Sequence, residues 1–380
     1  MEFRSANPKP TVTRSSRPRS RLNGKLLGGL SALLITLLIN GLASAQPSFF
    51  APPFLPAQGS TSPSNGDLVP YGLAVVPRFF PGHTLSPGQL LVSNFNNSAG
   101  DGNLPGQGST IVIIDPASGQ QTGVFFQGTQ PIGFTNALSI LPQGFVIAGS
   151  LPTNSMGTSP TSGGLLVLNA NGNQITTITD GVNGAWGMAV NQTGGSSAQL
   201  FVANVLDGTI TRLEVSFGKG SFNEVGTPTT IGSGYAFAPD MAGLVVGPAG
   251  LFYETATDRL YVAAEGDNEI FVIKNASKTS NVGKGTLVFS DPSLEGPLGL
   301  IIGPNGNLIT ANADPTHFQN PATPSELVEF TKSGKFVREF SIDPNLGAAF
   351  ALLNVPVIGA NEFSYVDDFT SSITILRVAP

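Results

Sequence analysis

Amide and carboxylate side chains recur at the ends of short apolar stretches, and they have the clearest capacity for chemistry in this sequence. Five of them are candidate metal ligands: Asn94, Asn204, Glu265, Asn312 and Asp367. Oxygen ligands of this kind suit a hard cation such as Ca²⁺, which takes about six to eight of them. A cation held in this way polarises a carbonyl group and lowers the pKa of bound water, as hydrolysis of an ester or lactone requires.

A second interpretation of the same residues stays open. Asn and Asp tolerate left-handed backbone and bond to their own turns, so they also collect at strand ends for structural reasons. The neighbouring polar residues fit either interpretation: Asn96, Asn97, Asp207, Asp267, Asp314 and Asp368.

The aromatic and imidazole side chains offer a few further candidates. Of the two histidines, His83 and His317, the second lies just beyond Asp314, and Asp314 and His317 are therefore the candidate catalytic residues of a lyase that needs a general base. The alternative is that both are ordinary surface histidines, because neither has a ligand spacing. The single tryptophan, Trp186, either stacks on a ligand or belongs to the core.

Several function classes are excluded or disfavoured. The chain has no cysteine, which excludes disulfides, thiolate metal sites and a cysteine nucleophile. It also lacks Gly-x-Ser-x-Gly, phosphate-loop and His-Glu-x-x-His patterns, so the common serine hydrolase, nucleotide and zinc-protease classes are disfavoured. The net charge is −6 although residues 1–45 are strongly basic, so the remainder is acidic enough to repel nucleic acid.

The elements that carry these residues form six similar units. Each unit opens with a short apolar strand that contains a small residue, and successive openers lie about 50 to 65 residues apart, as in propeller blades with loop insertions. The openers span residues 71–76, 135–141, 186–190, 249–254, 298–303 and 350–355.

A second strand follows each opener and ends in small or polar residues, and an apolar third strand comes next. The second strands span 90–97, 145–150, 200–208, 260–268, 308–314 and 363–368, and the third span 110–115, 165–170, 210–215, 270–275, 327–332 and 373–378. More polar fourth strands are expected at 174–180, 286–291 and 335–343.

Four antiparallel strands cannot bury their faces alone, whereas radial stacking of the units buries both faces. The sequence therefore predicts an all-β fold, a single six-bladed β-propeller of four-stranded antiparallel blades over residues 69–380. An array of immunoglobulin-like sandwiches would need domains of about 100 residues, which is much longer than this unit. The sixth unit ends at its third strand, and we expect residues 49–55 or 67–70 to supply the missing one.

The N-terminus has the pattern of an export signal. Basic side chains precede an apolar run at 26–42, and Ala43-Ser44-Ala45 follows it, which predicts a signal peptide over residues 1–45 cleaved after Ala45. An uncleaved membrane anchor is the alternative. Residues 46–68 form a lead-in rich in Pro, Ser and Gly. We expect a secreted or periplasmic monomer, and the lack of cysteine favours a bacterial source.

The units resemble NHL-type repeats, most closely at LFVANVLDGTITRLEV (200–215), LYVAAEGDNEIFVI (260–273) and PLGLIIGPNGNLITANAD (297–314). The repeat is also similar to that of the regucalcin and gluconolactonase propellers, and Glu295-Gly296-Pro297 resembles that family's opening motif. This resemblance implies a divalent metal, such as calcium, on Glu, Asn and Asp side chains at the channel mouth.

Two functions remain in view. The first is an exported binding or interaction protein whose partner at the channel face is a small molecule, a glycan or a protein. The second is a metal-dependent lactonase-type hydrolase or a lyase. Fold alone does not decide between them.

Overall fold

The computed structural model describes residues 47–50, 53–98, 103–218, 220–240, 244–312, 325–345, 349–355 and 362–378. The chain divides into two units, Met1–Ser44 and Ala45–Pro380. The predicted signal peptide lies outside the described residues. Within the described part of the chain, no helix has the length and apolar character needed to span a membrane.

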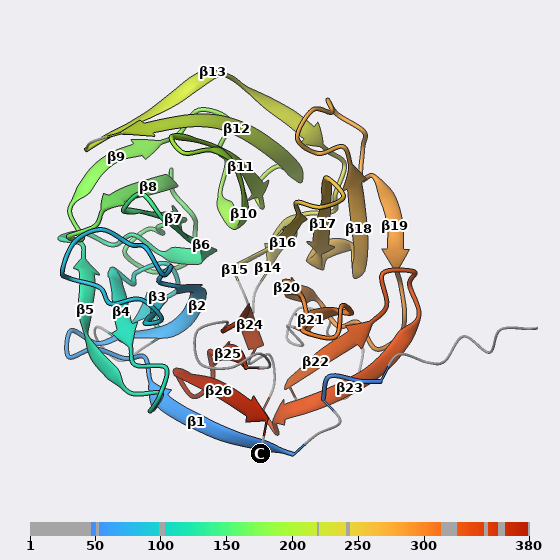
Figure 1. Ribbon diagram of the computed structural model, residues 1–380, viewed down its shortest axis with the longest axis horizontal. Coiled ribbons are helices and arrows are strands. Elements are labelled where there is room, and N and C mark those ends of the chain that lie inside the picture. Colours follow the sequence, from blue (N-terminus) through green and yellow to red (C-terminus); the bar gives the residue numbers. More distant parts are fainter. Residues whose placement is uncertain are drawn as a thin grey trace, which may run out of the picture. The chain divides into compact units, whose positions relative to one another are not determined.

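Six four-stranded antiparallel sheets surround a common axis as the blades of a propeller (Figure 1), which confirms the predicted fold class. Each of the first five blades uses four consecutive strands, which run from the axis outward. Blade I is β2 (Asp67–Val75), β3 (Leu90–Asn97), β4 (Thr110–Ile114) and β5 (Gln121–Gln127); blade II is β6 (Phe134–Leu141), β7 (Phe145–Ser150), β8 (Gly164–Asn169) and β9 (Gln174–Ile178); blade III is β10 (Ala185–Gly194), β11 (Ser197–Asn204), β12 (Thr209–Gly218) and β13 (Ser221–Gly232).

Blades IV and V continue the ring, and the last blade combines both parts of the chain. Blade IV is β16 (Pro248–Glu254), β17 (Arg259–Ala264), β18 (Glu269–Lys274) and β19 (Thr286–Phe289); blade V is β20 (Pro297–Ile302), β21 (Leu308–Asn312), β22 (Ser325–Phe330) and β23 (Phe336–Asp343); blade VI is β24 (Ala349–Asn354), β25 (Phe363–Asp367), β26 (Ser372–Val378) and β1 (Phe54–Ser60). A short 3₁₀ turn, η1 (Glu265–Asp267), follows β17.

All six expected openers coincide with inner strands, whereas two outer strands and one extra hairpin were not anticipated. Strand β13 is largely exposed, and β5 buries one residue and leaves the others intermediate or exposed, so neither shows the apolar alternation that marks a strand in sequence. The hairpin of β14 (Ala238–Asp240) and β15 (Leu244–Val246) comes between blades III and IV in the chain.

Glycines in the inner strands allow neighbouring blades to approach closely at the axis. A Cβ atom on Gly187, Gly250 or Gly299 would collide with a backbone carbonyl oxygen of the next blade's inner strand. The glycine in the openers of blades III to V therefore has a steric cause, because only hydrogen fits between these strands.

The N-terminal lead-in closes the ring. Strand β1 pairs with β26 over its full length, from Phe54 opposite Val378 to Ser60 opposite Ser372. The expected closing segments, 49–55 and 67–70, were therefore misplaced: the first overlaps β1 by two residues, and the second belongs to β2 of blade I. The Pro residues of the lead-in do not prevent pairing, because β1 is an edge strand.

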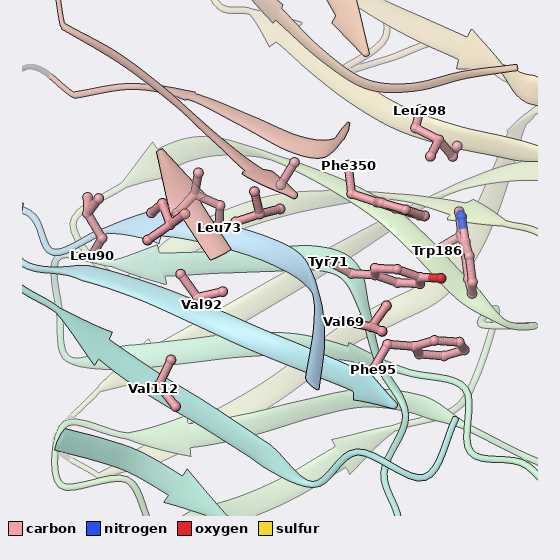
Figure 2. Packing of buried hydrophobic residues seen from close by; sticks show 14 of the residues in the cluster. Val69, Tyr71, Leu73, Leu90, Val92, Phe95, Val112, Trp186, Leu298 and Phe350 are labelled. Atoms are coloured by element: carbon pink, nitrogen blue, oxygen red, sulfur yellow. The ribbon is translucent and has the colours of Figure 1, made fainter. Parts of the chain in front are cut away.

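The core consists of apolar clusters between adjacent blades and one cluster on the axis. Figure 2 shows part of the axial cluster: the Tyr71 ring is stacked between Phe350 and Phe95, at centroid distances of 3.8 and 4.6 Å, and Trp186 packs edge-on beside it. Leu244 from the β14–β15 hairpin belongs to the same cluster. We call these aromatic side chains the axial plug.

Candidate functional site

The polar residues at the ends of the second strands occupy equivalent positions in the repeat. Each pairs with a residue at or near the start of the inner strand of its blade, as in Asn204 with Ala185 and Asn312 with Pro297. Because the strands are antiparallel, all of these ends lie at one end of the ring, which we call the entry end. The equivalent residues in blades I to VI are Asn94, Ser150, Asn204, Ala264, Asn312 and Asp367.

Two of the candidate ligands hold the chain segment that enters their own blade. The Asn204 Oδ1 atom accepts a hydrogen bond from the backbone N–H of Asn183 at 2.9 Å, and its Nδ2 donates to the Gly181 carbonyl. In blade V, Asn312 Oδ1 accepts from the N–H of Glu295 at 3.1 Å, and its Nδ2 donates to the Ser293 carbonyl. These amides therefore act as backbone clamps.

The same position is used in a related way elsewhere. Ser150 donates from its hydroxyl to the Ile132 carbonyl at 2.7 Å. Asn94 Nδ2 donates to the Thr61 carbonyl at 3.0 Å. The Asp367 carboxylate accepts from the backbone N–H of Thr370. The recurrence of polar residues at second-strand ends thus has a structural cause in these blades, close to the turn interpretation.

The remaining sequence candidates are placed as follows. Glu265 begins η1, one residue beyond the clamp position, and is buried. Asp314 and His317 lie outside the described residues. His83 is exposed in the loop between β2 and β3. Trp186 is 2% exposed within the axial plug, so it belongs to the core.

The entry end carries acidic groups beneath its surface. Asp368 lies one residue beyond the clamp position, and burial together with the neighbouring Asp367 raises the pKa of its carboxyl group well above the usual range. Burial, followed by the nearby carboxylates of Asp368 and Glu265, raises the pKa of the Tyr71 hydroxyl. The electrostatics at this end of the axis therefore favour protonated, neutral side chains.

These groups do not assemble into a cation site among the described residues. No three His, Asp or Glu side chains of that part of the chain come close enough together to hold a metal ion. The side-chain oxygens of Asn204 and Asn312 also already accept hydrogen bonds from backbone N–H groups. One buried amide oxygen of the candidate set, Asn94 Oδ1, has no hydrogen-bond partner among the described residues. A single free amide oxygen falls short of the six to eight oxygens that Ca²⁺ takes, so we assign no cation here and derive no chemistry through one.

A cavity of ≈ 290 Å³ lies further along the inner strands than the plug. All six blades contribute to it, so it is the axial channel on the side away from the entry end. Its lining is formed by residues of the six inner strands: Leu73, Asn136, Leu138, Met188, Gly250, Leu251, Phe252, Gly299, Leu300, Ile301, Ala351, Leu352, Leu353 and Asn354. We call it the axial cavity.

Two asparagines are the polar side chains of this lining, and sequence reasoning missed both. The Asn354 Nδ2 atom donates to the Ile302 carbonyl at 2.6 Å. Asn136 is half-buried and makes no side-chain hydrogen bond to the described residues. The available signal was the opener of the second unit, where Asn stands among residues that are otherwise small or apolar.

Comparison with solved structures agrees with this architecture. A gluconolactonase from Xanthomonas campestris superposes with a TM-score of 0.52 at 11% identity, covering 86% of this chain and 97% of that one. A putative gluconolactonase gives 0.52 at 12% identity, covering 88% and 96%. The chain has a gluconolactonase-like six-bladed fold. At such identities the likeness concerns the fold alone, and neither protein-family models nor curated proteins gave a match.

Proposed function

We propose that this protein is an exported binding propeller that holds a small ligand in its axial cavity. The observation that carries the proposal is the cavity itself, which is lined by the inner strands of all six blades. Its volume of ≈ 290 Å³ is just below the range of about 300–1,000 Å³ that ligand pockets occupy, which suits a ligand smaller than a drug-sized molecule. A concave, mainly apolar site with a few polar groups is the usual form of a small-molecule site.

The entry end supports this choice over a hydrolytic site there. Its repeated polar side chains clamp incoming backbone, and aromatic rings fill the axis directly beneath them. Export is proposed on the pattern of residues 1–45, whose apolar run and Ala-x-Ala site fit a cleaved signal.

The test uses δ-valerolactone, a neutral ring that serves both as a ligand probe and as a lactonase substrate. We expect saturation-transfer NMR to show binding to the purified protein, with no hydrolysis above the buffer blank with or without Ca²⁺. Leu353→Phe narrows the cavity and should abolish binding. Leu287→Phe is the matched control, because Leu287 is 50% exposed on an outer strand.

Metal analysis and melting curves with and without EDTA complete the test. No stoichiometric metal and unchanged melting are expected. Metal-dependent hydrolysis of the lactone would establish the lactonase alternative and overturn the proposal. Absence of binding, or equal binding to the Leu353→Phe protein, would remove the axial cavity as the site.

A further inference from the structure

We propose that Asn136 orients the ligand of the axial cavity, and that this ligand is a small neutral molecule with an apolar body and an amide group. The inference rests on the proposed function and assigns its specificity. It is drawn from an irregularity that blade II alone shows among the inner strands.

Every inner strand contains a bulge near its start, and the bulge in blade II is larger. In blade III the pairing passes from Ala185–Asn204 to Gly187–Ala203, which leaves one extra residue on the inner strand. Blades I, IV, V and VI show the same shift of one residue. In blade II it passes from Phe134–Ser150 to Leu138–Ala148, which leaves two.

Asn136 lies within this double bulge. Bulges next to binding sites commonly redirect a side chain, because the extra residue is released from the regular pleat. The inner strands of blades III to V carry glycine at the corresponding place, where a side chain would collide with the next blade. The extra residue in blade II thus makes room for a polar side chain on the axis that blades III to V exclude.

The Asn136 amide is available to a ligand. It lines the cavity, is only half-buried, and makes no hydrogen bond to the described residues. Asn354 differs, because its Nδ2 atom is already bonded to the Ile302 carbonyl. An amide offers a donor and an acceptor side by side, so its best complement is a second amide that forms two hydrogen bonds with it.

The remaining lining defines the rest of the ligand. It contains no charged side chain, and most of it is aliphatic. Transferring an ion from water into such a site without a partner is strongly unfavourable. The cavity therefore selects a neutral molecule whose apolar part contacts the aliphatic lining.

The probes are δ-valerolactam, which has an amide donor and acceptor, and δ-valerolactone, which has the same ring but no N–H donor. We expect the lactam to bind more tightly than the lactone to the unaltered protein, and 5-aminopentanoate, its charged ring-opened form, not to bind. Asn136→Ala should weaken lactam binding by about 10-fold and remove the preference for the lactam.

Asn136→Leu, which is close to Asn in size, is the second variant, and Asn173→Ala is the matched control because Asn173 is an exposed asparagine of the same blade. Circular dichroism and melting curves show whether each variant is folded. An unchanged lactam affinity in both Asn136 variants, with binding still lost in Leu353→Phe, overturns this inference and leaves the proposed function standing. If none of the probes binds to the cavity of the unaltered protein, both this inference and the proposed function are overturned.

Discussion

Glu329 of β22 ties the N-terminal lead-in to blade V, and its removal is the sharpest test of how the ring is closed. Its side chain is fully buried and accepts hydrogen bonds from the Ser48 hydroxyl at 2.6 Å and from the backbone N–H of Phe49 at 3.0 Å. The amides of Asn305 and Asn307 donate to it at 2.7 and 2.6 Å. One carboxylate therefore joins the lead-in to two turn residues of blade V.

The expected loss follows from these donors. Glu329→Ala leaves a hydroxyl, a backbone N–H and two amides without their acceptor in a buried place. Breaking a buried charged network of this kind costs about 3–5 kcal/mol of unfolding free energy. Glu329→Gln keeps the shape but replaces charge-assisted bonds with neutral ones, and should cost about 1–3 kcal/mol. The loss of unfolding free energy is limited by the free energy needed to detach the lead-in from blade V, because beyond that value the lead-in detaches while the rest of the protein stays folded.

Guanidinium denaturation measures the change in unfolding free energy, and hydrogen exchange locates it. We expect faster exchange at Phe49 and Phe50, whose rings pack against Phe363 between the blades. Glu339→Ala is the control, because Glu339 is exposed on the adjacent strand β23, opposite Val328. A Glu329→Ala protein within about 1 kcal/mol of this control, with unchanged exchange at Phe49, would refute the reasoning.

Three further predictions test the axis and the clamps. Burial raises the folded-state pKa of Asp368, so above the ordinary carboxyl pKa of about 4 the folded state binds more protons than the unfolded state, and stability is lost as pH rises through the folded pKa. Asp368→Asn should therefore raise Tm at pH 7 and leave it unchanged at low pH. An equal shift of Tm at both pH values would contradict this. Gly299→Ala should lose about 2–3 kcal/mol or more because its Cβ meets the Phe350 carbonyl, whereas Gly195→Ala, with open space around it, should be neutral in denaturant titrations. Asn204→Ala should lose about 2–3 kcal/mol by the same measurement, and Asn173→Ala almost none; equal losses would show that the clamp is not what stabilises blade III.

The inner part of each blade could be predicted from sequence, and the outer part could not. Inner and second strands are buried on both faces, so they appear as apolar runs with polar ends, as at 145–150 in β7. Outer strands such as β13 face solvent and carry mixed residues without a period. The closing strand was misplaced for a related reason: β1 is an exposed edge strand, and its register depends on β26, which lies more than 300 residues away.

The candidate site was harder to predict because the sequence does not distinguish two possible roles of the same repeated polar position. An Asn at the end of a second strand looks the same whether it binds a cation or a backbone N–H, and only the partners of Asn204 and Asn312 distinguish these roles. Asn136 could not be predicted as a site residue from sequence. The bulge that contains it has two extra residues where the other inner strands have one, and only the pairing register shows this difference.

The placement of the axial cavity follows from the same repeat. In blades I, III and VI the residue that follows the partner of the second-strand end carries a large ring, and Tyr71, Trp186 and Phe350 meet on the axis. These rings pack together at that level of the axis, and the axial cavity lies further along the strands, where glycines and aliphatic side chains line it. The ligand site proposed on this axis therefore lies beyond the plug, and the side chain best able to recognise a polar group there is the one that the double bulge releases from the sheet.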